Sequence, residues 1–193
     1  MGTGKDSINR CPWCVGHADY EEYHDQVWGK PVHDSVELFA KLCLDGQQAG
    51  LSWITILRKQ AGYESAFFGF DPYRLAQVQG DARAAFIETQ MQNRGIVRNR
   101  LKINAIFKNA DAFVRLHEQG VDFAQWLWSF VGHSPVENQP KSMQDIATET
   151  AESQALSKAL KKAGFTFVGP TIVYAFMQAV GMVNDHLIDC DFK

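Results

Sequence analysis

The sequence lacks the segments that place a protein across or outside a membrane. No apolar run approaches the roughly 20 residues that a membrane-spanning helix needs. Residues 1–7 lack the apolar stretch of a secretory signal, and we expect them to form a flexible N-terminus. These two absences predict a cytoplasmic protein without a membrane partner.

Cysteine is scarce and basic residues do not dominate. Four cysteines in 193 residues, without a secretion signal, favour reduced thiols or metal ligands over a disulfide framework. The formal net charge of −3 gives no global signature of nucleic-acid binding, so such a partner must be argued from local charge. Five basic residues and no acidic one lie between Arg94 and Lys108, and Lys158, Lys161 and Lys162 precede a glycine-rich turn. A solvated helix face explains either cluster equally well.

Alternating strand patterns with hairpin signals, internal repeats and low-complexity segments are absent, and the patterns that remain are helical. We therefore predict an all-α protein with one domain over residues 8–193, built as one lobe or as two. Asp34 followed by Glu37 is typical of an N-cap with its reciprocal carboxylate, and Asp71-Pro72 of another helix start. The expected helices cover 34 to 46 or 50, 53–62, a segment from 72, 101–114, 123–131, 155–163 and a segment from 170, with a loop over 133–143.

The segment 164–169 has the pattern of a tight turn between two helices. Gly164 and Gly169 bracket it, and Pro170 opens the second helix. Glycines let a phosphate approach backbone N–H groups where the helix dipole is positive. This arrangement is typical of a helix-hairpin-helix motif. The alternative interpretation is an ordinary helix-helix connection with a glycine C-cap.

Potential zinc ligands lie at the two ends of the chain. Cys11 and His24 are near the start, and His186 and Cys190 have a spacing that suits one side of a helical turn. The neighbouring Cys11-Pro-Trp-Cys14 could instead be half of a zinc knuckle or a redox dithiol, and His17 is a spare ligand. From residue types alone, scattered reduced cysteines stay an open interpretation.

Aromatic residues gather in the first third of the chain among polar groups. An aromatic cage beside a carboxylate suits an extruded, electron-poor nucleobase, because a cationic ring gains from stacking and from the negative charge. Packing in an ordinary core is the competing interpretation. The aromatic residues are Trp13, Tyr20, Tyr23, Trp28 and Trp53, interleaved with His24, Asp25, Asp45, Gln47 and Gln48.

Several motifs together resemble the bacterial 3-methyladenine DNA glycosylase I family, of the helix-hairpin-helix glycosylase superfamily. The resemblance runs in order from Arg10 to Cys190. Its most specific part is Gly46-Gln47-Gln48-Ala49-Gly50-Leu51-Ser52-Trp53. The other motifs are Arg10-Cys11-x-Trp13, Tyr20-x-x-Tyr23-His24-Asp25-x-x-Trp28-Gly29, Trp126-x-Trp128-Ser129-Phe130-Val131, Gly164-Phe165-x-Phe167-Val168-Gly169 and Asn184-Asp185-His186-x₃-Cys190.

The resemblance implies a helix-hairpin-helix glycosylase fold whose terminal segments are joined by one structural Zn²⁺. It also implies an enzyme that excises N3-methyladenine, and less readily N3-methylguanine, from double-stranded alkylated DNA by base flipping, with free 3-methyladenine as the product. We expect a monomer. The implied metal ligands are Cys11, His24, His186 and Cys190; the implied base pocket is Trp13, Tyr20, Tyr23, Trp28, Asp45 and Trp53; the implied DNA contacts are Leu51, Phe165, Thr166, Phe167, Val168, Gly169 and Thr171.

The sequence departs from the family pattern at two positions. Asp45 stands where the family usually has glutamate, so the carboxylate reaches one methylene less far, and Val27 replaces an acid next to the pocket. The resemblance assigns hydrogen bonds to the base to Tyr23 and Asp45 and implies no general base. N3-alkylation already makes the purine a good leaving group, so selective binding is the expected source of catalysis. With no lysine nucleophile expected, the enzyme should be monofunctional.

Two other functions are compatible with these residues. One is a zinc-stabilised protein that binds damaged DNA without excision, which the change to Asp45 makes conceivable. The other is an oxidoreductase built on Cys11 and Cys14, although such motifs normally follow a strand that this sequence does not predict.

Overall fold

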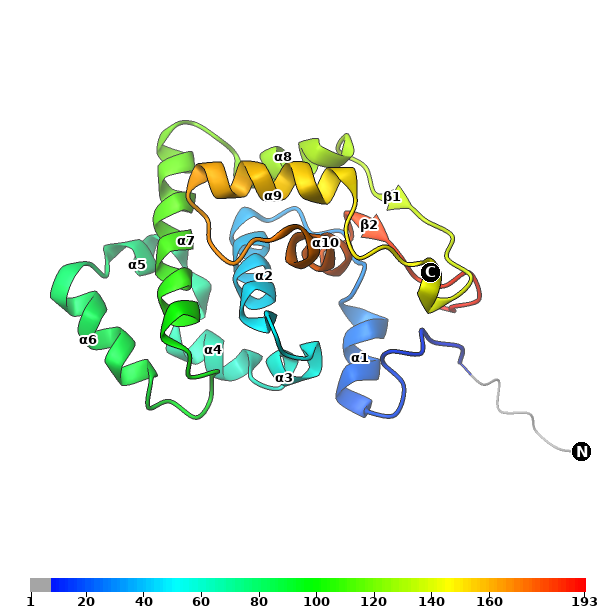
Figure 1. The fold of residues 1–193 in the computed structure, drawn as a ribbon, viewed down its shortest axis with the longest axis horizontal. Coiled ribbons are helices and arrows are strands. Elements are labelled where there is room, and N and C mark those ends of the chain that lie inside the picture. Colours follow the sequence, from blue (N-terminus) through cyan, green and yellow to red (C-terminus); the bar gives the residue numbers. More distant parts are fainter. Residues whose placement is uncertain (1–7) are drawn as a thin grey trace, which may run out of the picture.

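Helices make up most of the computed structural model, which describes residues 8–193 (Figure 1). The predicted flexible N-terminus, residues 1–7, lies outside the described residues. The elements are α1 (Ala18–Gln26), α2 (Ser35–Gln48), α3 (Trp53–Leu57), α4 (Gln60–Ala66), η1 (Phe68–Phe70), α5 (Pro72–Gln77), α6 (Gly80–Gln90), α7 (Arg100–Glu118), α8 (Phe123–Trp128), η2 (Ser129–Val131), β1 (Val136–Glu137), η3 (Met143–Asp145), α9 (Ala151–Ala163), α10 (Pro170–Ala179) and β2 (Val183–Asn184).

The two strands are a small departure from the all-α prediction. They pair in parallel, with Val136 opposite Val183 and Glu137 opposite Asn184. Strands of two residues are too short to show an alternating pattern, which is why the sequence did not predict them. The pair joins the segment before α9 to the segment after α10.

Local helix signals place the starts of α2, α5 and α10 correctly, whereas α1 and α6 were not predicted. The Asp34 carboxylate accepts from the backbone N–H groups of Val36 and Glu37, and Asp71 caps α5 in the same way. Ser52 occupies the N-cap position of α3, but its hydroxyl pairs with Thr55 Oγ1 at 2.8 Å and does not cap. The single helix expected over 53–62 is wrong, because α3 ends at Leu57 and α4 begins at Gln60.

One large apolar core holds the helices together. Helix α2 lies between α7 and α10 and packs on both, α9 packs on α10, and α5 packs on α7 (Figure 1). The helix faces that meet are mainly apolar, as the 3.6-residue period predicts. Fully buried members include Leu38, Leu42, Ile103, Ile106, Leu160, Val173 and Met177.

The two terminal segments lie side by side next to α1, away from α5 and α6 (Figure 1). Asp191 N–H donates to the carbonyl of Asn9 at 2.9 Å, and Asn9 N–H donates to the Asp191 carboxylate at 2.8 Å. The joining of the chain ends, expected from the motifs, is therefore present. Within residues 8–193, no helix is long and apolar enough to cross a membrane.

Candidate active site

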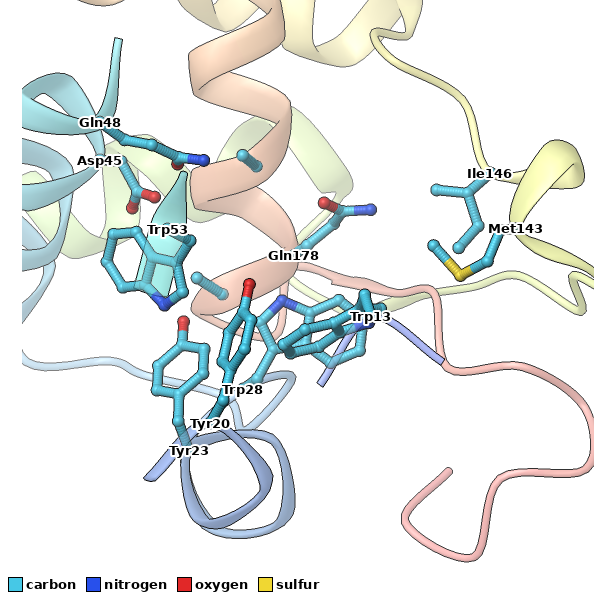
Figure 2. A pocket seen from close by; sticks show the side chains of 12 residues that line it. Trp13, Tyr20, Tyr23, Trp28, Asp45, Gln48, Trp53, Met143, Ile146 and Gln178 are labelled. Carbon is cyan, nitrogen blue, oxygen red and sulfur yellow. The ribbon is translucent and has the colours of Figure 1, made fainter. Parts of the chain in front are cut away.

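A cavity of about 200 Å³ opens between α1, the end of α2, α3 and α10 (Figure 2). It is smaller than the roughly 300 Å³ at which pockets for drug-sized ligands begin, so it suits a ligand the size of one base. The lining residues are Trp13, Tyr20, Tyr23, Trp28, Asp45, Gln48, Trp53, Met143, Ile146, Ala175, Gln178 and Ala179. All six residues predicted for the base pocket are among them.

The aromatic rings form one wall as a connected cluster apart from the main core. Trp13 lies edge-on to Tyr20, with ring centroids 4.9 Å apart, and to Trp28, at 5.1 Å. The ring centroids of Tyr23 and Trp53 are 5.5 Å apart. Edge-on packing fixes each ring and leaves ring faces directed at the cavity for a planar ligand. Of the two sequence interpretations, the cage is the one that the structure supports.

Asp45 places a carboxyl group in this apolar setting. It lies near the end of α2, its side chain is buried, and Oδ2 has no hydrogen-bond partner. Burial raises the pKa of Asp45 to about 8, a shift that Lys41 partly opposes. A buried carboxyl group without a partner is costly for the fold, so its retention indicates a partner supplied by the ligand.

Tyr23 and Trp53 add hydrogen-bond donors to the cavity. Burial raises the pKa of the Tyr23 hydroxyl well above its usual value, so the group stays protonated and can donate. Trp53 Nε1–H is buried and has no partner. Among the described residues, three buried side-chain atoms lack a partner: Asp45 Oδ2, Trp53 Nε1 and His186 Nε2. The first two belong to the cavity, and the third belongs to the cysteine and histidine cluster described next.

The predicted metal ligands meet next to the cavity. Ligand atoms of Cys11, His24 and Cys190 lie within 4.8 Å of one another, and all three side chains are buried. Cys190 Sγ is 3.6 Å from His24 Nε2. Tetrahedral zinc with ordinary bond lengths separates its ligand atoms by about 3.3–3.8 Å, so this spacing fits.

His186, the fourth predicted ligand, lies beside this group, although its ring nitrogens do not join the other three within the same 4.8 Å. Its ring centroid is 5.0 Å from that of His24, and Nε2 is the atom without a partner. Nδ1 of His186 contacts Asn184 Oδ1 at 2.9 Å, and Nδ1 of His24 contacts Asp25 Oδ1 at 2.8 Å. Both acceptors fix the proton on Nδ1 and leave Nε2 unprotonated, which is the state in which a histidine can ligate a metal.

The metal-ligand cluster supports the aromatic wall directly. The centroid of Trp13 is 5.2 Å from that of His24, and Trp28 is 4.6 Å from His186. Gly29 has a φ of 77°, and a Cβ there would come within 2.7 Å of His186 Cε1, so only glycine fits. Cys14 is buried but outside the cluster, and His17 is exposed.

The predicted hairpin is present between α9 and α10. Gly164 closes α9 with a φ of 101°, whereas Gly169 has a φ of −63° and needs no glycine. The left-handed residue that the sequence did not predict is Phe167, with a φ of 56°. Phe165 and Val168 are core residues, so any DNA contact at these two positions must come from the backbone.

Hydrogen bonds to the backbone hold the hairpin in shape. Asn109 accepts from Thr166 N–H at 2.8 Å and donates to its carbonyl at 3.2 Å. Thr171, in the first turn of α10, is exposed. The first N–H groups of a helix have no partner within it, so this turn can accept a phosphate.

Leu51 lies on the turn between α2 and α3 and is 41% exposed. Gly50, with a φ of 76°, makes this turn possible. Lys102 is buried beneath it, and its Nζ donates to the carbonyls of Gln47 and Ala49 at 2.7 and 2.6 Å. An exposed leucine on a turn that Lys102 holds in place suits the wedge role that the resemblance implies.

Sequence reasoning missed several residues of the site. Gln178 comes from α10, and Met143 and Ile146 come from the segment around η3, which no motif linked to the pocket. The basic cluster between Arg94 and Lys108 does not form one face, because Lys102 is buried and Arg100 pairs with Glu88. Val27, at the second departure, packs against the aromatic cluster. Only Ala175, Gln178 and Ala179 carried a periodic signal, because spacings of three and four residues place them on one face of α10.

Comparison with known proteins agrees with this geometry. The family model described as methyladenine glycosylase matches residues 13–193. A protein of Haemophilus influenzae named DNA-3-methyladenine glycosylase is 50% identical over 184 residues, covering 95% of this chain and 97% of its own length. DNA-3-methyladenine glycosylase 1 of Escherichia coli is 48% identical over 183 residues, covering 95% and 96%.

Solved structures of the same kind superpose over nearly the whole chain. A crystal structure of a 3-methyladenine DNA glycosylase I has a TM-score of 0.91 and 49% identity, covering 95% of this chain and 98% of its own. The enzyme from Staphylococcus aureus, described for its recognition of 3-methyladenine, has a TM-score of 0.91 and 39% identity, with 96% and 97% covered. The chain therefore belongs to the methyladenine glycosylase family, among the relatives of the bacterial 3-methyladenine DNA glycosylases I.

Proposed function

We propose that this protein hydrolyses the N-glycosidic bond of N3-methyladenine in double-stranded alkylated DNA and releases free 3-methyladenine. The observation that carries the proposal is the base-sized aromatic cavity with the buried, unpartnered carboxyl group of Asp45. Its relatives are named for this activity.

The cavity distinguishes a methylated base from a normal one by charge. N3-alkylation in DNA makes the purine ring a cation, and a cation stacks well on tryptophan and tyrosine rings. It also gives the Asp45 carboxylate the partner that it lacks in the free protein. A neutral adenine gains neither the cation–π stacking nor the attraction to the carboxylate, so it leaves the buried carboxyl group of Asp45 without a charged partner.

Base flipping brings the target into the cavity. Leu51 fills the gap left in the duplex, and the backbone of the hairpin from Phe165 to Thr171 holds the adjoining phosphates. The exposed Lys158, Lys161 and Lys162 on α9 add charge near these contacts. The duplex is distorted only when the extruded base gains enough in the pocket to offset the loss of stacking.

Catalysis then requires little chemistry from the protein. The alkylated purine departs as a neutral molecule, so no general acid has to protonate it, and water attacks the sugar. Tyr23 donates to the base and Asp45 stabilises its positive charge, which assigns both residues to recognition. Among residues 8–193 no lysine lines the cavity, which agrees with a monofunctional enzyme that leaves the DNA backbone intact. N3-methylguanine, with a carbonyl in place of the amine, is excised more slowly.

A single Zn²⁺ with a structural role belongs to this proposal. Cys11, His24, His186 and Cys190 supply two thiolates and two imidazole nitrogens, the common composition of a closed tetrahedral site. Four protein ligands leave no position for water, so the metal contributes no chemistry. It holds the segment that carries Trp13 next to the C-terminal segment.

The test is release of free 3-methyladenine from methylated duplex DNA by the purified monomer, followed by chromatography. Release with an intact DNA backbone is the expected result, with slower release of 3-methylguanine. Binding of methylated DNA without release would establish the alternative, a damage-binding protein. As a control, Trp53→Ala removes a ring of the cage and should lower release by about 5- to 150-fold, because base stacking contributes roughly 1–3 kcal/mol.

The oxidoreductase interpretation finds no support in the geometry. Cys14 is buried, and burial raises the pKa of its thiol to about 11, whereas redox cysteines have lowered pKa values and partial exposure. Its Sγ donates to the carbonyl of Cys11 at 3.1 Å. Cys14→Ser should therefore retain full excision activity.

A further inference from the structure

The amide of Gln178 faces the cavity in an orientation fixed by its neighbours. Gln178 Nε2 donates to Asp185 Oδ2 at 2.7 Å. Asp185 is buried and accepts two further hydrogen bonds, from Tyr174 OH at 2.7 Å and from Asn138 Nδ2 at 2.8 Å. Three donors converge on this carboxylate, so it acts only as an acceptor and the nitrogen of the amide must face it.

The orientation leaves the amide oxygen for the ligand. Gln178 lines the cavity, and Figure 2 shows its oxygen on the side of Asp45 and Trp53 and its nitrogen on the far side. A rotation of the amide would bring its carbonyl oxygen against the Asp185 carboxylate and lose a charge-assisted hydrogen bond. The cavity therefore presents a second fixed acceptor, on α10, in addition to the carboxyl group of Asp45 on α2.

We propose that Gln178 is a specificity-determining residue, whose Oε1 accepts a hydrogen bond from the exocyclic amine of the extruded base. This inference rests on the proposed glycosylase function. The amine of an adenine-type base carries two hydrogens, and two acceptors from different helices, Asp45 and Gln178, suit them. A guanine-type or hypoxanthine-type base has a carbonyl oxygen at that carbon, which would face the oxygen of Gln178 without a hydrogen between them.

The mismatch is costly because Gln178 cannot adapt. A site that holds a buried polar group against its natural partner rejects analogues that leave the group unpaired, more strongly than a shape mismatch does. Asp185 therefore contributes to selectivity indirectly. It prevents the Gln178 amide from turning its N–H₂ group toward the carbonyl oxygen of a guanine-type or hypoxanthine-type base. The aromatic cage recognises methylation, and Gln178 recognises which purine is methylated.

The test measures the affinity of the purified protein for two free bases by quenching of tryptophan fluorescence. The probes are 3-methyladenine and 3-methylhypoxanthine, which has a carbonyl oxygen in place of the amine. The wild type should bind 3-methyladenine at least about 100-fold more tightly, from one lost hydrogen bond and one opposed pair of oxygens. Gln178→Met keeps the length of the side chain but has no acceptor, and it should reduce this ratio by about tenfold or more.

The ratio separates a specific role from a structural one. If Gln178→Met lowers the affinity for both bases equally, or changes neither, the inference is wrong. Gln178→Asn, which withdraws the amide by one methylene, provides the same measurement if the methionine variant does not fold. Gln125→Leu, at an exposed position of α8, controls for the loss of a glutamine. A wild type that neither binds 3-methyladenine nor releases it from DNA would refute the proposed function itself.

Discussion

Asp45 shows how a functional side chain can weaken the fold that carries it. Its carboxyl group has a pKa of 3.8 in an unfolded chain and about 8 in the folded protein, because burial disfavours the charged form. Between these values the folded state binds the proton and the unfolded state does not. The free energy of unfolding therefore falls as pH rises through this range, and the contribution is lost once pH exceeds about 8.

The first prediction is that Asp45→Asn stabilises the protein at neutral pH. The pKa of Asp45 in the unfolded chain lies roughly three pH units below pH 7, and each unit corresponds to about 1.4 kcal/mol. The free energy of unfolding should therefore rise by at most about 4 kcal/mol. Urea denaturation at pH 4 and pH 7 measures it. The variant and the wild type should differ less at pH 4, and an equal difference at both pH values would contradict the pKa assigned to Asp45.

The same carboxyl group predicts the pH dependence of excision. A cationic base needs the ionised form of Asp45, so kcat/KM should rise about tenfold per pH unit below about 8 and level off above it. Asp45→Asn should remove this dependence and lower kcat/KM by about 10–100-fold, as expected for a hydrogen bond to a charged group. Asp81→Asn, exposed on α6, should keep the wild-type profile. If kcat/KM of the wild type did not change with pH below about 8, Asp45 would not act through its charge.

At the scale of elements, the sequence predicted the starts of helices better than their mutual placement. Asp34 and Asp71 cap their helices through their own side chains, so short-range rules suffice. Phe167 adopts a left-handed backbone conformation because the hairpin packs against α2, where a Cβ at Gly46 would lie 3.3 Å from Phe167. Such a conformation depends on a contact more than 100 residues away, and no local pattern indicates it.

Lys102 is a second case in which position decides the role. Within a basic run it suggested a DNA-facing helix surface, but its Nζ lies under the turn that carries Leu51 and binds the last carbonyls of α2. Burial lowers the pKa of this lysine, and the two carbonyls retain it in the interior. The residue types at the end of α2 do not reveal which distant cation caps them.

We predict that Lys102→Met destabilises the protein and loosens the Leu51 turn. Two hydrogen bonds to a charged group disappear and two carbonyls lose their donor, which should cost about 2–4 kcal/mol in denaturant unfolding. Excision from duplex DNA should fall more than the affinity for free 3-methyladenine, because the turn acts on the duplex. Lys108→Met is the matched control in the same helix. Equal losses in both assays would indicate a purely structural lysine.

At the scale of the whole molecule, the resemblance led us to expect that the two ends of the chain meet, and Cys11 and His24 do lie close to Cys190. Residue types alone left zinc and reduced cysteines both open. The hydrogen bonds by which Arg10 holds Asp25, and Asp25 holds His24, were not predictable. Arg10 donates to both carboxylate oxygens of Asp25, at 2.8–3.0 Å, and this pair depends on how α1 meets the N-terminal segment.

The last prediction concerns the metal that we propose at the junction of the two ends. Zinc binding links residues far apart in sequence, so its loss should destabilise the fold and then widen the cavity, since Trp13 and Trp28 pack on its histidines. Metal analysis should find about one zinc per chain in the wild type and in Cys14→Ser, and none in Cys190→Ser, whose melting temperature should fall by several degrees. Asp25→Ala should weaken zinc affinity by about 10–100-fold while leaving all four ligands in place, because it removes the acceptor that fixes the His24 tautomer. A Cys190→Ser protein that is metal-free yet fully stable and active would mean that protein contacts alone join the ends and shape the pocket.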